Sequence, residues 1–161
     1  APKPSSSSSL SSRNGLASHA RRSLAGLSGM KTFYEQIGGE AGVSTLVNAF
    51  LKALEKERSA PLRACYREDL SYYACRMTAF LSGWLGGPMR YPGRFGLPMI
   101  VEKHRAFPVN RELALLWLEC MRDALRETVP DESLRLSLEG AFWQMADHLQ
   151  QASVTNGSPR A

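Results

Sequence analysis

The spacing of the apolar residues constrains the fold most strongly. Over residues 40–57, apolar side chains recur every three or four positions, at Val43, Leu46, Val47, Phe50, Leu51 and Leu54. This spacing places them on one face of an amphipathic helix. Residues 68–85, 111–128 and the stretch from 130 onward repeat the pattern, and no useful length of sequence alternates as a half-buried strand would. The sequence predicts an all-α domain whose last two helices pack as an antiparallel pair.

Glycine and proline mark the expected breaks. Gly86-Gly87-Pro88 ends the second long helix, because glycine supplies the terminal geometry and proline cannot continue the hydrogen-bond ladder. Residues 86–98 contain four glycines and three prolines, which predicts a long irregular loop of the kind that often has a function. Asn110 is expected to cap the helix that begins at Arg111.

The N-terminal segment differs in kind from the rest. Ten of the first thirty residues are serine, and the segment contains four basic residues and no acidic one. We therefore predict a disordered extension over residues 1–29, a folded domain over 30–152 and a flexible tail over 153–161. The extension has the composition of an organelle transit peptide, but it could equally be vector sequence or residues upstream of a start at Met30. We expect a cytoplasmic protein, or an organellar one if the extension is a native transit peptide.

Charge and cysteine usage narrow the class of protein. The net charge is +5, but the N-terminal segment contributes most of it, so the folded part gives no reason to expect nucleic-acid binding. No apolar stretch approaches the roughly 18 residues of a membrane span. The sequence has three cysteines, Cys65, Cys75 and Cys120, and this odd number argues against a framework of disulfides. We expect all three to be buried as small hydrophobic side chains in a protein of a reducing compartment.

The histidines give little by themselves. His19 lies in the N-terminal segment, and His148 lies near the end of the last helix, where a cation is favourable. His104 stands between the irregular loop and the break at Phe107-Pro108, which by itself favours a structural or surface histidine over a ligand. No group of side chains has zinc-ligand spacing, and neither a phosphate loop nor a Ser or Cys nucleophile motif is visible.

Several motifs in order carry a resemblance to a known family. They are Phe33-Tyr34-Glu35-x-Ile37-Gly38-Gly39, the run from Phe80 to Pro88, Tyr91, Phe95-Gly96-x-Pro98, the run from His104 to Val109, and Trp117-Leu118-x-Cys120-Met121. Together they resemble the truncated haemoglobins of the second group, over roughly residues 32–150. The resemblance implies a two-over-two helical sandwich around a haem. The resemblance implies haem b, and because there is no Cys-x-x-Cys-His, covalent attachment is not expected.

The resemblance also implies roles for individual residues. His104 falls on the position of the axial ligand to the iron, and neutral imidazole is a good haem ligand. Trp117 and Tyr66 match residues that reach a bound ligand, while Arg76 and Tyr91 match positions that touch the haem propionates. The remaining haem contacts expected are Phe50, Met77, Phe80, Leu81, Trp84, Met99, Lys103 and Phe107.

Three positions of the expected distal pocket depart from the family pattern. Leu51 stands where the family usually has a tyrosine that donates to bound oxygen. Tyr73 stands where a small residue or histidine is common, and Met77 where leucine or glutamine is common. The resemblance therefore implies that the hydroxyl donor has moved from one wall of the pocket to the other.

The resemblance favours reversible binding, or transport, of oxygen or another diatomic gas such as NO or CO. One alternative is a redox enzyme, either a nitric-oxide dioxygenase that needs a separate reductase or a peroxidase-like enzyme. Another is a six-coordinate sensor in which Tyr73 or Met77 ligates the iron at rest, and a plain helical adaptor is a fourth. We expect a monomer or homodimer with no nucleic-acid or membrane partner.

Overall fold

A computed structural model describes residues 29–96, 104 and 109–155. The chain divides into two units, residues 1–30 and 31–161, and the described residues of the first unit, Gly29 and Met30, are exposed. The second unit contains the helices α2 (Phe33–Gln36), α3 (Gly39–Leu54), η1 (Glu57–Ser59), α4 (Ala60–Arg63), α5 (Ser71–Trp84), α6 (Tyr91–Phe95), α8 (Arg111–Thr128) and α9 (Glu132–Thr155). The expected all-α class is confirmed: the described residues form helices and no strand.

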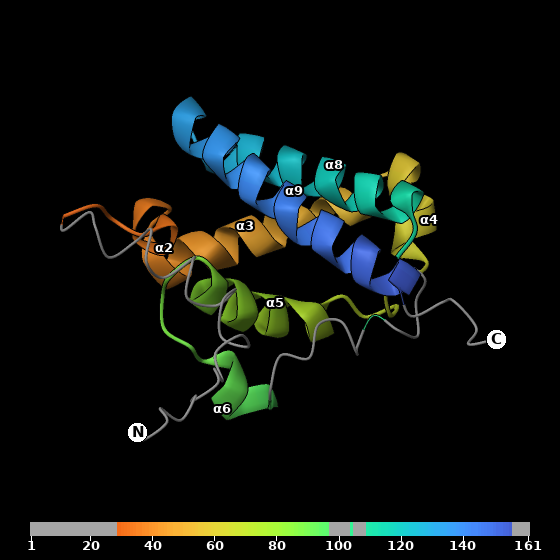
Figure 1. Ribbon diagram of the computed structural model, residues 1–161, viewed down its shortest axis with the longest axis horizontal. Coiled ribbons are helices and arrows are strands. Elements are labelled where there is room, and N and C mark those ends of the chain that lie inside the picture. The colour runs from red at the N-terminus through yellow and green to blue at the C-terminus, as the bar shows by residue number, and fades with distance from the viewer. Residues whose placement is uncertain (1–28, 97–103, 105–108, 156–161) are drawn as a thin grey trace, which may run out of the picture. The chain divides into compact units, whose positions relative to one another are not determined.

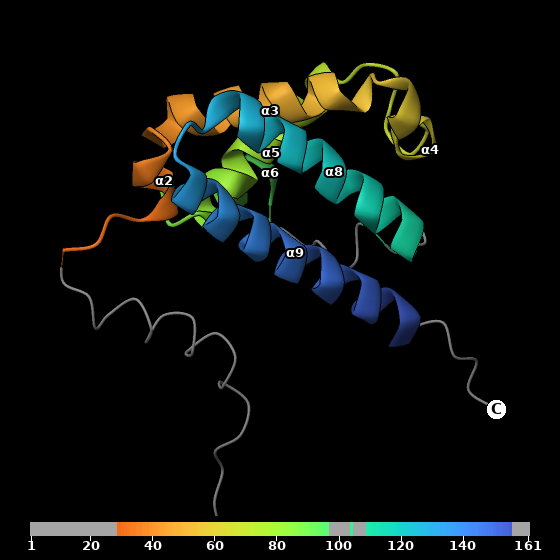
Figure 2. The ribbon, with the colours of Figure 1, turned by 90° about the horizontal axis from the view of Figure 1, so that it is seen from above.

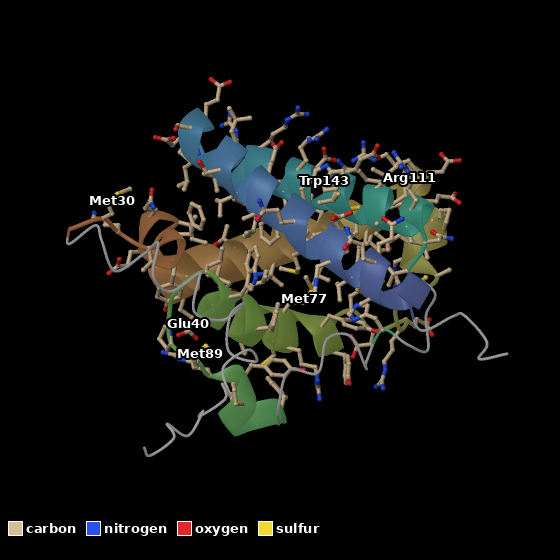
Figure 3. The ribbon with its side chains drawn as sticks, viewed as in Figure 1. Met30, Glu40, Met77, Met89, Arg111 and Trp143 are labelled. Carbon is tan, nitrogen blue, oxygen red and sulfur yellow. The ribbon has the colours of Figure 1, made fainter. Side chains whose placement is uncertain are left out.

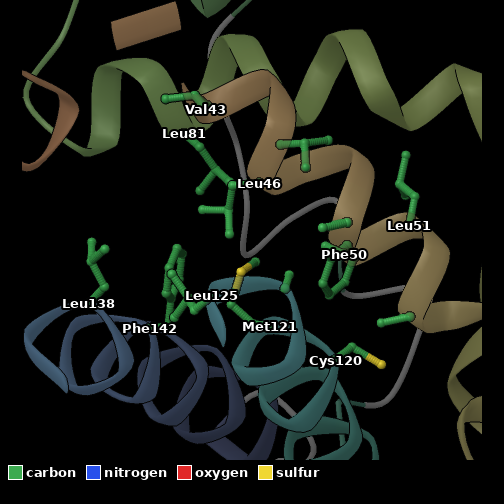
Figure 4. Packing of buried hydrophobic residues seen from close by; sticks show 14 of the residues in the cluster. Val43, Leu46, Phe50, Leu51, Leu81, Cys120, Met121, Leu125, Leu138 and Phe142 are labelled. Carbon is green, nitrogen blue, oxygen red and sulfur yellow. The ribbon is translucent and has the colours of Figure 1, made fainter. Parts of the chain in front are cut away.

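Helix α3 is the centre of the second unit, with α5 and α8 packed against it (Figure 1). Eight of its residues are buried, among them Val43, Leu46 and Phe50. They meet Leu81 of α5, Met121 and Leu125 of α8, and Phe142 of α9 in one apolar core (Figure 4). Because the hydrophobic effect scales with the apolar area removed from water, this core is the main stabilising contribution to the fold.

Helices α8 and α9 follow one another and lie side by side in opposite directions (Figures 1 and 2). The Asn110 side chain accepts a hydrogen bond from the Leu113 amide at 2.8 Å, and α8 spans Arg111–Thr128 as predicted. At the start of α9, the Asp131 carboxylate accepts from the Leu134 amide at 2.7 Å. Both caps satisfy amides that lack an intrahelical partner. Helix α9 continues to Thr155, past the predicted domain end at residue 152.

The double glycine of the opening motif joins α2 to α3. Gly38 has φ +100° and Gly39 has φ +68°, a region that disfavours a side chain. A Cβ atom on Gly42 would lie 1.8 Å from the carbonyl oxygen of Ile37. These glycines therefore let the short helix α2 fold back closely on the start of α3.

Helix α5 ends where predicted, since Gly86 follows it with φ +95°, but it begins at Ser71 and not at residue 68. The prediction of an irregular loop over 86–98 was wrong for residues 91–95, which form α6. Pro92 lies in the first turn of α6, where its missing N–H costs nothing, so proline there starts a helix. No helix of the described ranges is long and apolar enough to span a membrane.

Candidate functional site

Aromatic side chains connect α3 and α5 to α8 and α9. The ring of Phe50 lies 5.5 Å from that of Trp117, and Trp117 lies 5.7 Å from Phe142. Phe142 stacks on Trp84 of α5 at 5.0 Å. The side chain of Met77 lies on the side of α5 that faces α9 (Figure 3). It packs against the core while remaining partly exposed. This arrangement forms an aromatic and apolar wall that reaches from α3 through α8 and α9 to α5.

A hollow of about 140 Å³ opens where α5 meets α6. Its lining includes Phe80, Trp84 and Tyr91, three of the predicted haem contacts. The rings of Phe80 and Tyr91 meet edge to face at 6.1 Å, while Trp84 keeps 36% of its surface exposed. An apolar lining with several aromatic rings is typical of ligand sites in proteins.

Tyr66 and Trp117 form the polar part of the predicted distal pocket. The side chain of Trp117 hydrogen-bonds that of Tyr66, and because the indole N–H only donates, the Tyr66 oxygen is the acceptor. Burial raises the pKa of Tyr66 above its ordinary value of 10.0, and the hydrogen bond from Trp117 offsets only part of the increase. Tyr66 therefore keeps its own proton at neutral pH.

Tyr73 supports this pair from outside. Its ring meets the ring of Tyr66 edge to face at 4.8 Å, and its hydroxyl oxygen accepts from the Arg67 amide at 3.0 Å. The hydroxyl of Tyr73 is therefore held at the backbone before α5. Leu51, at the position where the family usually has a tyrosine, is buried in the core.

The three cysteines have different environments. Cys120 is fully buried as expected, but Cys65 is half-buried and Cys75 is exposed, so the expectation of three buried thiols was wrong. Cys75 lies on the outward face of α5, one residue before Arg76. Ser59 donates to the Ala53 carbonyl at 3.1 Å and lies 3.2 Å from the Cys120 sulfur. Burial raises the pKa of the Cys120 thiol.

The two predicted propionate contacts both meet the ring of Phe95, and Tyr91 also lines the hollow. The Arg76 guanidinium stacks on the ring of Tyr72 at 3.9 Å and on that of Phe95 at 4.7 Å. Tyr91 is buried beside Phe95, with ring centroids 5.2 Å apart. The predicted inner face of α5 is less buried than expected. Leu81 is buried, whereas the other four predicted residues of that face remain at least partly exposed: Tyr73, Met77, Phe80 and Trp84.

His104 is exposed and lies in the chain between α6 and α8. The predicted haem contacts Met99, Lys103 and Phe107 fall outside the described residues. Phe142 belongs to the aromatic wall but was not among the predicted site residues. Its helical spacing from Leu138 and Met145 indicated only an interior position, so no signal in the sequence distinguished it from a core residue.

These residues fit a flat apolar group that carries carboxylates at one edge. Met77, Phe80 and Trp117 are large and apolar, yet the protein alone leaves each partly exposed. Arg76 supplies a cation at the rim, and Tyr66 with Trp117 supplies polar hydrogens within the apolar wall. A haem needs an apolar cover, a cation for its propionates and an imidazole for its iron, so the donor set matches this group.

Comparison with known proteins identifies the family. Residues 32–151 match the family model described as bacterial-like globin. The chain is 36% identical over 117 residues to the group 2 truncated haemoglobin YjbI of Bacillus subtilis, covering 72% of this chain and 86% of that protein. The structure resembles the group II 2-on-2 haemoglobin of Agrobacterium tumefaciens, with TM-score 0.71, 32% identity, and coverage of 76% of this chain and 95% of the other.

A further similarity is to the truncated oxygen-avid haemoglobin of Bacillus subtilis, with TM-score 0.65, 32% identity, and coverage of 74% of this chain and 98% of the other. Globins as a family bind diatomic ligands at haem. The chain therefore belongs to the bacterial-like globin family, as a truncated haemoglobin of the second group.

Proposed function

We propose that the protein holds haem b without a covalent bond, with His104 as the axial ligand, and reversibly binds oxygen or another diatomic gas. Haem supplies the iron that coordinates the gas. The relative described as oxygen-avid supports oxygen as the ligand. His104 is exposed in the protein chain, and a neutral imidazole is a common haem ligand.

The hydrogen bond between Trp117 and Tyr66 carries the proposal. It places the Tyr66 hydroxyl, which accepts from the Trp117 N–H and keeps its own hydrogen free to donate, in an apolar wall, where a hydrogen bond is stronger than in water. Burial keeps Tyr66 protonated, so its hydroxyl can donate to a partly negative ligand. Trp117 fixes the orientation of that hydroxyl and adds an apolar plate. Each such hydrogen bond contributes about 1–3 kcal/mol, or roughly ten- to a hundredfold in the dissociation rate.

The other residues bind and orient the group. Phe80, Trp84 and Tyr91 exclude water from its flat faces, and Arg76 pairs with its carboxylates at the rim. Leu51 adds no donor, so Tyr66 and Trp117 take the role that the family usually shares with a tyrosine hydroxyl at the position of Leu51. Tyr73 holds the Tyr66 ring in place through their edge-to-face contact.

A double-mutant cycle tests the proposal. Oxygen dissociation rates are measured for the wild type, Trp117→Phe, Tyr66→Phe and the double variant. We expect each single variant to release oxygen roughly ten- to a hundredfold faster. The double variant should release oxygen more slowly than the product of the two single-variant rate increases predicts, because each residue orients the other.

Trp143→Phe is the matched control, because Trp143 lies on α9 with 52% of its surface exposed (Figure 3). The Trp143→Phe variant should release oxygen at the wild-type rate. Unchanged rates in both single variants would contradict the roles of Trp117 and Tyr66.

A further inference from the structure

Three arginines alternate with two aromatic rings from the segment before α5, along α5, to α6. The two helices are neighbours in the ribbon (Figure 1). The guanidinium carbons of Arg67 and Arg76 lie 4.0 Å and 3.9 Å from the centre of the Tyr72 ring. Arg76 also lies 4.7 Å from the centre of the Phe95 ring, and Arg94 lies 5.6 Å from it. We name these five residues the arginine stack.

The arginine stack has no carboxylate partner among the described residues. Among the described residues, the arginines that form ion pairs are Arg58, Arg63, Arg90 and Arg122. None of them is a member of the arginine stack. The acids next to Arg67 in sequence are Glu68 and Asp69. Asp69 instead accepts from the Ser71 amide at 2.9 Å.

The aromatic rings stabilise each guanidinium by cation–π attraction, but they do not neutralise it. Three cations are therefore held close together. Arg76 is half-buried and donates one N–H to the Tyr72 carbonyl at 3.4 Å, while Arg67 and Arg94 are exposed and can present their N–H edges to an anion. Planar guanidinium groups bind carboxylates in a bidentate manner. The arrangement suits a ligand that presents several carboxylates.

Acidic protein surfaces fit the stack better than nucleic acid does. Recognition of single-stranded nucleic acid depends on bases that stack on aromatic faces, and here guanidinium groups already stack on Tyr72 and Phe95. The chain after residue 30 also has 16 basic and 15 acidic residues, so it has little general attraction for a phosphate backbone.

The position of the stack indicates what the acidic partner does. Arg76, its middle cation, is the residue that we expect to pair with the haem carboxylates, while Arg67 and Arg94 are exposed on either side. We propose that Arg67 and Arg94 are the docking surface for an acidic electron-carrier protein that reduces the iron. This inference rests on the proposed function. One electron passes from the reduced carrier to ferric iron, which becomes ferrous, and the carrier leaves oxidised by one electron with no bond made or broken.

The test uses flavodoxin, an acidic protein that carries flavin mononucleotide, as the probe. Binding of oxidised flavodoxin to Arg67→Gln/Arg94→Gln is measured at low ionic strength, together with the rate at which reduced flavodoxin converts the ferric protein to the ferrous carbon monoxide form. We expect binding and rate to fall about tenfold, because charge complementarity acts mainly on association. The dependence on salt should weaken in parallel.

The matched control is Arg111→Gln/Arg126→Gln. It removes two exposed arginines of α8 that also form no ion pair among the described residues, and Arg111 lies far from α6 (Figure 3). The control should bind flavodoxin within twofold of the wild type. Reduction by a small neutral flavin should be equal in all three proteins.

The proposed docking surface would be contradicted if the control and the stack variant lost flavodoxin binding and reduction rate equally, or if neither variant lost them. So would a stack variant that loses binding to single-stranded RNA or to anionic lipid vesicles but keeps flavodoxin. Binding of flavodoxin is read on the polypeptide whether or not haem is present. A failure of the proposed function would appear separately, as a missing Soret band.

Discussion

The side chain of Trp117 on α8 hydrogen-bonds the hydroxyl of Tyr66, which lies between α4 and α5. The contact joins the two halves of the helical sandwich at the wall that we assign to the gas ligand. Tyr66 is half-buried, and the loss of water around its hydroxyl raises its pKa.

Stability should fall above pH 10, in part because of Tyr66. The unfolded chain releases this proton near the ordinary pKa of 10.0, whereas burial raises the pKa in the folded protein. Above pH 10 the folded state therefore binds more protons than the unfolded state, and the free energy of unfolding decreases as pH rises. Tyr66→Phe should decline less steeply with pH than the wild type in urea unfolding at about pH 9–11. Equal slopes would contradict a buried, protonated Tyr66.

Met77→Leu should leave the resting ferric absorption spectrum unchanged. Met77 packs against the core from α5, and leucine replaces its volume at a cost usually below about 1.5 kcal/mol. An open pocket has no thioether bound to the iron, so the spectrum does not depend on Met77. A six-coordinate spectrum that becomes five-coordinate in the variant would favour the sensor hypothesis.

Gly42→Ala should destabilise the fold by about 1–3 kcal/mol, because overpacking forces the backbone to shift. A Cβ atom there would lie 1.8 Å from the Ile37 oxygen, which is a backbone atom. Gly140→Ala is the control: a Cβ there meets nothing within 4 Å, and alanine in a helix interior should stabilise by about 0.5–1 kcal/mol. Urea unfolding measures both. Equal stability of the two variants would contradict the close approach of α2 to α3.

The cysteines should differ in their rates of reaction with a thiol reagent such as dithionitrobenzoate. Cys75 is exposed and should react within the mixing phase, while Cys120 is buried with a raised thiol pKa and should react only when the protein unfolds. Cys75→Ala should remove the fast phase alone. A fast phase of two thiols that includes Cys120 would contradict the packing around Ser59.

Local signals in the sequence predicted the helices well where a cap or a break stands beside the periodic pattern. Asn110 and Gly86 are examples, and they set the start of α8 and the end of α5. Helix α6 was missed because Pro92-Gly93 has the composition of a loop, although proline in a first turn is compatible with a helix.

The site was less predictable than the fold. Periodicity placed Trp117 on the inner face of its helix but gave it no partner, and only the resemblance assigned it to a pocket. Its hydrogen bond to Tyr66 and the stacking of Trp84 on Phe142 join residues far apart in sequence. Such contacts depend on how the helices pack. The same holds for Tyr73, whose hydroxyl the sequence placed in the pocket and the structure places against the Arg67 amide.

His104 is the proposed ligand of the haem iron. The most direct test is the absorption spectrum of the purified protein, oxidised, reduced, and reduced with carbon monoxide, beside that of His104→Ala. His148→Ala, which changes an exposed histidine of α9, is the matched control. We predict a Soret band that shifts with carbon monoxide in the wild type and in the control, and that is lost or altered in His104→Ala. A wild-type spectrum without a Soret band after haem addition, or one that His104→Ala leaves unchanged, would contradict ligation of a haem iron by His104.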